Sequence, residues 1–226
     1  MAEFMEPTLI TGLFSKNGNE IPGKVLHEAH TSLKVNSWYK SRLLFLSGDR
    51  SSTLALQQMG VPVYRVFDDA PGFIQQAPVF RMKHWMVYQM LKEHKEILWI
   101  DWDTISLKPL DDAFFEYCRQ KNTPKFVFIP GYHATVNCSV YYVNQTWLSR
   151  MEKSFYLPTK YPNDELMWAN ILPKDITKRD EYWWGERVVN IWLESECCWV
   201  KPKTYFAHIK TFDYIKHLTI PEDLEI

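Results

Sequence analysis

Asp101 and Asp103 directly follow the apolar run Ile97–Ile100, and only Trp102 separates them. Two carboxylates at the edge of a core repel each other, and removing them from water is costly. A divalent cation such as Mn²⁺ or Mg²⁺ relieves this repulsion, because it takes carboxylate oxygens together with substrate phosphates as ligands. The spacing therefore predicts a metal site that opposes negative charge on a departing phosphate group. The simpler alternative is that both aspartates end a strand and begin a turn.

The elements that position this pair alternate between strand and helix. Strands are predicted from apolar runs at 9–14, 43–46, 61–67, 97–100, 125–129 and 136–143. Helices are predicted at 26–34, 51–59 (with Ser51 as its cap), 78–94, 145–153 and 164–171. This alternation, with continuous apolar runs, is typical of an α/β fold with a mostly parallel central sheet flanked by helices. Such sheets bind ligands beyond the carboxyl ends of their strands.

The composition limits the classes of partner. The 226 residues hold 26 basic and 27 acidic side chains, a net charge of −1, and no basic run that would favour nucleic acid. No apolar stretch approaches the roughly 20 residues of a membrane helix, and the first residues lack a signal-peptide pattern. We therefore expect one domain over 1–226 in the cytoplasm, with free cysteines and with residues 1–4 open to interpretation as a cloning scar.

The segment around the aspartate pair resembles the central signature of GT-A glycosyltransferases. In those families an arginine lies on the helix before the D-x-D strand, and here Arg81 stands twenty residues before Asp101. Pro109–Asp112 matches the stretch that follows the motif. The likeness is greatest to retaining enzymes such as bacterial lipooligosaccharide galactosyltransferases and glycogenin. It implies a Rossmann-like GT-A domain that transfers a sugar from a nucleotide donor.

Three later segments follow in the order that such families use. Val136–Val143 resembles their N-x-G-V strand, Asn163–Asn170 their DQ…N segment, and Tyr205–Lys210 their C-terminal HF…K segment. The chain departs from the pattern where Ser139 replaces the glycine of the first segment and where no glycine separates the last histidine and lysine. The first strand also lacks the aspartate of many relatives. These departures bear on the identity of the donor more than on the fold.

The resemblance implies a metal site in which Asp103 is a direct ligand and Asp101 contributes to the metal or to the ribose. His208 would be the third ligand, although a lone histidine is more often packed in a core or on the surface. Because imidazole suits Mn²⁺ better than Mg²⁺, Mn²⁺ is the expected ion and Mg²⁺ the alternative.

The resemblance also implies contacts to the donor. Arg81 and Lys210 are assigned to the diphosphate, whose charge calls for cationic partners. Lys83 is an alternative for the same task, but we interpret it as a solvated charge on the helix. The other positions assigned to the donor are Thr11, Leu13, Phe14, Asp101, Trp102 and Asn137.

Asp164 and Glu165 form the second acidic pair, and the resemblance places Asp164 beside the reacting sugar. In an inverting enzyme one of them takes the proton of the acceptor hydroxyl as general base. In a retaining enzyme the leaving phosphate assists, and the carboxylate stabilises positive charge on the sugar ring. The likeness favours retention. The alternative is that Asp164 only caps a helix that begins near Glu165. The aromatic segment Tyr182–Gly185 offers faces for an acceptor sugar, although core packing is the commoner role of such residues.

The sequence thus favours a metal-dependent glycosyltransferase that uses a UDP-sugar and a glycan or other hydroxyl acceptor. Two alternatives stay open. A nucleotidyltransferase or a metal phosphohydrolase also uses paired aspartates, although no glycine-rich phosphate loop follows the first strand. A non-catalytic module that binds nucleotides or carbohydrates can keep the same fold.

Overall fold

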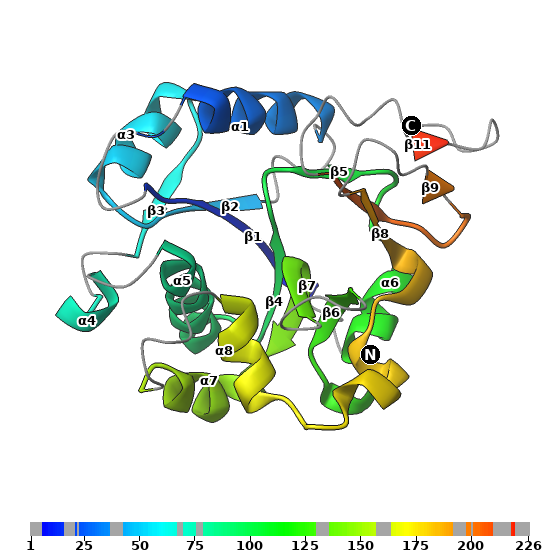
Figure 1. Ribbon diagram of the computed structural model, residues 1–226. Coiled ribbons are helices and arrows are strands. Elements are labelled where there is room, and N and C mark those ends of the chain that lie inside the picture. Colours follow the sequence, from blue (N-terminus) through cyan, green and yellow to red (C-terminus); the bar gives the residue numbers. More distant parts are fainter. Residues whose placement is uncertain are drawn as a thin grey trace.

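The computed structural model describes residues 6–15, 21, 23–36, 43–66, 70–75, 79–129, 136–156, 164–191, 198–199, 201–209 and 218–219. Within these ranges the chain forms a central six-stranded sheet with helices packed on both faces (Figure 1). Two hydrophobic clusters fill the space between the sheet and the helices, one on each face. The α/β architecture expected from the alternating pattern is therefore confirmed.

The central sheet has the strand order β3-β2-β1-β4-β7-β6. In that order the strands are β3 Val63–Arg65, β2 Leu43–Ser47, β1 Thr8–Leu13, β4 Glu96–Ile100, β7 Val136–Asn144 and β6 Lys125–Phe128. The strands from β3 to β4 run parallel, whereas β7 is antiparallel to both β4 and β6. The sheet is mostly parallel, as predicted, and its antiparallel pairings lie on one side.

Each face of the sheet has its own set of helices (Figure 1). One face packs against α4 (Gly72–Gln75), α5 (Val79–Glu93), α7 (Leu148–Ser154) and α8 (Asp164–Ile171). The other packs against α1 (Gly23–Val35), α3 (Arg50–Gln58) and α6 (Asp112–Arg119). Side chains alternate along a strand, so Ile10 of β1 joins the first cluster while Leu9 and Leu13 join the second. No helix of the described ranges has the length and apolarity needed to cross a membrane.

The last third of the chain adds short elements around a second sheet. This sheet has the order β5-β10-β8, with β5 Thr104–Ser106, β10 Phe206–Ile209 and β8 Val188–Ile191. A further pair joins β9 (Cys198–Trp199) to β11 (Leu218–Thr219). The 3₁₀ helices are η2 Gln120–Asn122, η3 Gln145–Trp147, η4 Ile176–Lys178, η5 Asp180–Tyr182 and η6 Gly185–Arg187.

The predicted start of the third helix needs a correction. Ser51 was expected to cap it, but α3 begins at Arg50 and its cap is Asp49. The Asp49 carboxylate accepts a hydrogen bond from the backbone N–H of Ser52 at 2.8 Å, and the Ser52 hydroxyl accepts one from the N–H of Asp49 at 3.1 Å. This reciprocal pair satisfies two N–H groups at the helix start, which a cap at Ser51 does not do.

Candidate active site

The aspartate pair lies at the point where the strand order of the sheet reverses. From β1 the chain adds β2 and β3 on one side and β4 on the other, and ligands of open α/β sheets bind at such points beyond the carboxyl ends of the strands. Asp101 directly follows β4. Its backbone N–H donates to the carbonyl oxygen of Ser139 at 2.7 Å, which ties this turn to β7.

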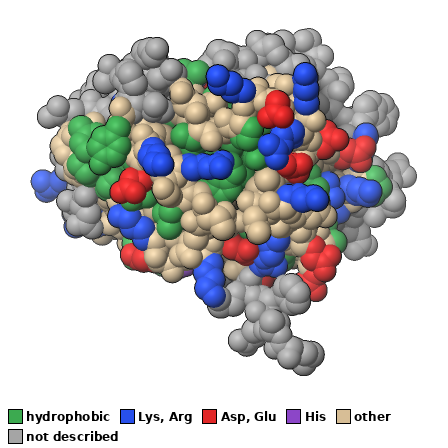
Figure 2. Space-filling model, turned by 90° about the horizontal axis from the view of Figure 1, so that it is seen from below, with side chains coloured by type: hydrophobic (Ala, Val, Ile, Leu, Met, Phe, Trp, Pro, Cys, Tyr) green, Lys and Arg blue, Asp and Glu red, His purple; other side chains and the backbone are tan. Residues whose placement is uncertain are grey.

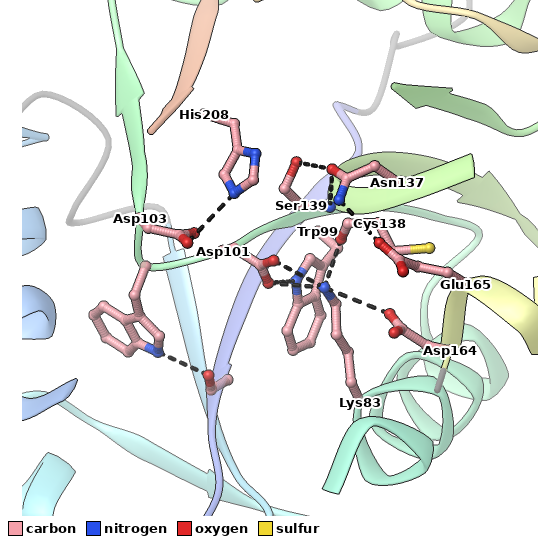
Figure 3. Close-up of polar contacts among 12 residues, drawn as sticks. Lys83, Trp99, Asp101, Asp103, Asn137, Cys138, Ser139, Asp164, Glu165 and His208 are labelled. Carbon is pink, nitrogen blue, oxygen red and sulfur yellow. Dashed lines mark hydrogen bonds and ion pairs between the residues drawn. The ribbon is translucent and has the colours of Figure 1, made fainter. Parts of the chain in front are cut away.

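The Asp101 carboxylate is held by two donors from the α5 face of the sheet (Figure 3). Lys83 Nζ lies 2.8 Å from Oδ1 and 3.0 Å from Oδ2, and Trp99 Nε1 donates to Oδ1 at 2.6 Å. Trp99 and Asp101 are two positions apart along an extended segment, so their side chains leave the same face. Lys83 reaches them from α5, which packs on that face.

Lys83 is buried at the centre of the site, so its interpretation as a solvated helix charge is wrong. Its Nζ also donates to the carbonyl oxygen of Cys138 at 2.5 Å and lies 3.5 Å from Asp164 Oδ2. The rings of Trp99 and Tyr141 lie 5.1 and 5.8 Å from Nζ, within range of a cation–π contact. Burial opposes the charged ammonium, but the surrounding carboxylates outweigh burial and raise the pKa of Lys83 above its usual value.

A signal for Lys83 was present in the sequence. It follows Val79 by four residues and precedes Met86 by three, so it falls within the apolar face of its own helix. A lysine at such a position must either leave the face or find a partner. Here it meets carboxylates from two other elements.

Two of the carboxylates around Lys83 have raised pKa values. Burial raises the pKa of Asp101 to about 6, with Lys83 opposing the shift and the negative charge of Asp103 adding to it. Burial likewise raises the pKa of Asp164, where Lys83 opposes and Glu165 adds. One ammonium therefore does not fully compensate this group of acidic side chains.

Asp103 and His208 meet although they lie 105 positions apart in the sequence. Asp103 Oδ2 lies 3.3 Å from His208 Nε2 (Figure 3). The antiparallel pairing of β5 with β10 sets His208 opposite Thr104, and the N–H of Ile209 donates to the carbonyl oxygen of Asp103 at 2.8 Å. Burial opposes both charges, but their attraction outweighs it, so the pKa of Asp103 is lowered and the pKa of His208 is raised.

This pair fits part of the predicted metal site. In the described ranges no three His, Cys, Asp or Glu side chains are grouped as ligands of one ion. Carboxylate and imidazole are nevertheless both suitable ligands for Mn²⁺. Ions of this type often use one or two protein carboxylates and complete their shell with substrate phosphates and water. Asp103 and His208 thus fit a site that a phosphate-bearing substrate would complete.

A second polar pair adjoins Asp164 at the start of α8. The side-chain amide of Asn137 donates to Glu165 Oε1 at 2.9 Å, and its oxygen accepts from the N–H of Ser139 at 3.1 Å. Ser139 also donates its hydroxyl to the same oxygen. The pairing of β6 with β7 shifts register beside Asn137, which re-aims side chains as β-bulges do next to functional sites. Ser139, which stands where the resemblance predicts a glycine, therefore orients Asn137.

Comparison with known proteins rests on structure, because no protein-family model and no curated protein matches the sequence. Mouse xyloside xylosyltransferase 1 in its apo form is 11% identical, with a TM-score of 0.55 over 90% of this chain and 97% of that chain. A glycosyltransferase involved in the glycosylation of the major capsid of PBCV-1 is 14% identical, with a TM-score of 0.51 over 90% and 92%. This chain has the GT-A glycosyltransferase fold. The bifunctional glycosyltransferase WbbM in its apo form adds a TM-score of 0.51 at 9% identity, over 92% of this chain and 46% of that one.

Within this GT-A fold, three of the residues assigned to the donor line one pocket. Thr11, Asp101 and Trp102 share it with Ser32, Leu33, Asn36, Leu43 and Ile100. Trp102 Nε1 donates to the carbonyl oxygen of Gly12 at 2.7 Å. A Cβ at Gly12 would lie 2.7 Å from the Trp99 ring, so only glycine lets β1 approach β4 and α5 this closely.

Other predicted contacts lie elsewhere. Leu13 packs into the hydrophobic cluster of the α3 face, and Phe14 packs against the cluster of the α5 face, so neither lines the pocket. The guanidinium of Arg81 is buried and donates to the carbonyl oxygen of Phe155 at 3.1 Å, and burial lowers its pKa. Lys210 lies outside the described residues.

Proposed function

We propose that this protein is a metal-dependent glycosyltransferase that moves a sugar from a nucleotide-sugar donor to a hydroxyl group of a glycan. The supporting observation is the imbalance of charge at the carboxyl edge of the sheet. Among the residues that the structure describes, Asp101, Asp103, Asp164 and Glu165 gather there around Lys83 and His208 alone. In a GT-A fold this edge is where a ligand that brings its own cation would bind.

The residues that would hold the ion are Asp103 and His208. Their carboxylate and imidazole favour Mn²⁺ over Mg²⁺. When bound, the ion would supply positive charge against the departing nucleoside diphosphate. The ion pair between Asp103 and His208 holds both side chains in place, because each stabilises the charged form of the other.

The donor would lie across the edge from Thr11 to Asn137. Thr11 and Trp102 line a small pocket beside β1 with room for about one water molecule, so the nucleotide would lie over this pocket and not within it. We take UDP as the nucleotide, as the family likeness favours. The sugar would then lie towards Asn137 and Glu165.

The second acidic pair is held in a fixed place where it can stabilise positive charge on the sugar. Asp164 is 3% exposed and faces Lys83, and Glu165 is 8% exposed and accepts from Asn137. Anions fixed in this way can stabilise positive charge on a sugar ring. Their burial supports retention of configuration, in which the leaving phosphate assists the acceptor hydroxyl.

The acceptor would approach from the end of β6. Phe128 is 39% exposed and packs on Trp183 with ring centroids 4.8 Å apart. The register places Val127 opposite Asn137, one residue from Phe128. In the predicted acceptor segment, Trp184 is core and only 1% exposed. Phe128 is thus an accessible aromatic ring at the end of β6, and such faces stack on sugars.

Calorimetry of UDP binding, with and without Mn²⁺, tests this proposal. We expect Mn²⁺ to strengthen UDP binding in the native protein and to have no effect in Asp103→Asn. The matched control is Glu96→Gln, which removes a carboxylate from the opposite end of β4 and should keep the Mn²⁺ effect. If UDP fails to bind with or without metal, the proposal is wrong.

Turnover distinguishes the remaining alternatives. A transferase slowly passes sugar from a UDP-sugar to water, so Mn²⁺-dependent release of UDP is the expected result. Release of pyrophosphate from a nucleoside triphosphate and a sugar phosphate would instead identify a nucleotidyltransferase. Tight binding of UDP-sugars with no turnover against water or glycans would identify a binding module.

A further inference from the structure

A small pocket lies between strand β1, helix α1 and the turn that follows β4. Its lining includes Thr11 of β1, Ser32 of α1 and the turn residues Asp101 and Trp102. The cavity volume is about 10 Å³ for the centre of a water molecule. A buried site needs about this much space to hold one water, so the pocket has room for about one water molecule.

The Thr11 side chain faces α1 and has no partner in the chain. Along β1, Leu9 and Leu13 stand two positions on either side of Thr11, and both join the hydrophobic cluster on the face of the sheet that α1 covers (Figure 1). Alternate residues of a strand share a face, so Thr11 faces α1 as well. Thr11 is 2% exposed, and its hydroxyl oxygen has no hydrogen-bond partner among the described residues. Because an unpaired buried hydroxyl is costly, Thr11 needs a partner from the pocket.

Ser32 lines the same pocket and has a hydrogen bond to give. Its hydroxyl oxygen accepts from the side-chain amide of Asn36 at 3.0 Å. A hydroxyl that accepts in this way still has its own proton to donate. Asn36 cannot donate to Thr11, because its amide protons are used on Ser32 and on the carbonyl oxygen of Thr104 at 2.8 Å. Two buried hydroxyl groups therefore line one pocket without bonding each other directly.

We propose that this pocket binds one ordered water molecule, which hydrogen-bonds the hydroxyl groups of Thr11 and Ser32 and so joins β1 to α1. A buried water needs at least two polar partners, and the two hydroxyls supply them. The water gives Thr11 the partner that the chain does not provide, at a small cost in entropy. Asp101 and Trp102 line the same pocket, so the water also lies beside the turn that carries the first aspartate of the candidate site. The inference does not depend on the proposed function, and its tests use the protein without ligands.

Thr11→Val distinguishes a hydrated pocket from a dry one by the sign of its effect. Valine has nearly the shape of threonine but cannot hydrogen-bond a water. In a hydrated pocket the water loses a partner, so the melting temperature should fall by about 2–4 °C. In a dry pocket the substitution only removes an unpaired hydroxyl, so the melting temperature would rise, and this result would overturn the inference. Differential scanning calorimetry measures the shift.

Thr104→Val is the matched control. Thr104 is fully buried, its hydroxyl likewise has no partner among the described residues, and it does not line the pocket. Its replacement should therefore leave the melting temperature unchanged or raise it. A fall as large as that of Thr11→Val would show that the loss at Thr11 comes from the change of side chain and not from a bound water.

A double-mutant cycle shows whether the two hydroxyls hold the same water. Ser32→Ala should lower the free energy of unfolding in urea, as Thr11→Val does. The protein with both substitutions should lose clearly less than the sum of the single losses, because the second substitution acts on a water that the first has already released. Additive losses would show that the two hydroxyls share no ligand and would contradict the inference.

A crystal structure that resolves ordered waters gives the direct result. We expect one water at hydrogen-bond distance, about 2.5–3.0 Å, from the hydroxyl oxygens of both Thr11 and Ser32. An empty pocket, or a Thr11 hydroxyl that bonds another residue directly, would refute the proposal.

Discussion

The two ends of strand β4 carry acidic residues in opposite situations. At its start, Glu96 accepts three hydrogen bonds from Arg119 at 2.8 to 3.0 Å and one from the Tyr142 hydroxyl at 3.0 Å. One carboxylate there faces one guanidinium, and the bidentate fork fills its lone pairs. This end is balanced in charge by the chain itself.

Beyond the other end of β4, carboxylates outnumber cations among the residues that the structure describes. Asp101 and Asp164 share Lys83, and Asp103 meets a histidine that is charged only when protonated. Burial raises the pKa of Asp101 to about 6 in spite of the nearby ammonium. On the face shown in Figure 2, basic and acidic side chains are interspersed. A balanced cluster stabilises a fold, whereas an unbalanced one at a ligand-binding edge calls for a cation from outside.

The largest expected effect is that of Asp103→Asn on catalysis. The substitution removes a proposed metal ligand, and metal ions contribute several kcal/mol of transition-state stabilisation, so turnover should fall by about a thousandfold. The melting temperature of the metal-free protein should fall, because the buried His208 loses the carboxylate that stabilises its charged form. Steady-state assays and thermal melts measure both. Full activity in this variant would show that the excess of carboxylates beyond β4 is not needed for function.

Removing the imidazole partner should have the next largest effect. His208→Gln keeps a polar side chain but lacks the second proposed ligand, so Mn²⁺ affinity should fall by about a hundredfold. UDP binding without metal should not change. Calorimetry with and without Mn²⁺ measures the difference. If metal-free UDP binding falls as well, His208 supports the pocket and does not bind the ion.

Substitution at the balanced end should act on stability alone. Glu96→Gln leaves the guanidinium of Arg119 without its charged partner, and for a pair with side chains 21% and 24% exposed the cost is about 1 kcal/mol. Urea denaturation measures this loss, and turnover per folded molecule should match that of the native protein. A large loss of turnover at full stability would show that the two ends of β4 do not differ in the way described.

The smallest expected effect is at the rim of the site. Phe128→Ala should raise the KM for the acceptor about three- to tenfold without changing kcat, since one aromatic contact is worth about 0.5–1.5 kcal/mol. The matched control is Tyr64→Ala, which removes another partly exposed aromatic ring, 42% exposed, from β3 at the opposite side of the sheet. An equal rise in KM for both variants would refute a specific role of Phe128.

Local patterns predicted much of the fold. The apolar run at 97–100 identified β4. The periodicity over 78–94 identified α5, which ends at Glu93, one residue before the predicted end. Such patterns work because the 3.6-residue and two-residue periods reflect the geometry of a single element. They missed the true cap of α3, because Asp49 and Ser51 are both good caps and only the backbone geometry decides between them. The antiparallel direction of β7 was also not predicted, since an apolar run does not encode which way its neighbour runs.

The sequence by itself determined that two aspartates follow a buried strand, that a second acidic pair begins a helix, and that a histidine lies near the end of the chain. Only the tertiary structure decided which of these groups meet. The β5–β10 register brings His208 to Asp103, and the packing of α5 against β4 aims Lys83 at Asp101 and turns Arg81 towards Phe155. The physical reason is that a charge pair depends on distances of a few ångströms between elements, and those distances are set by packing across the whole core.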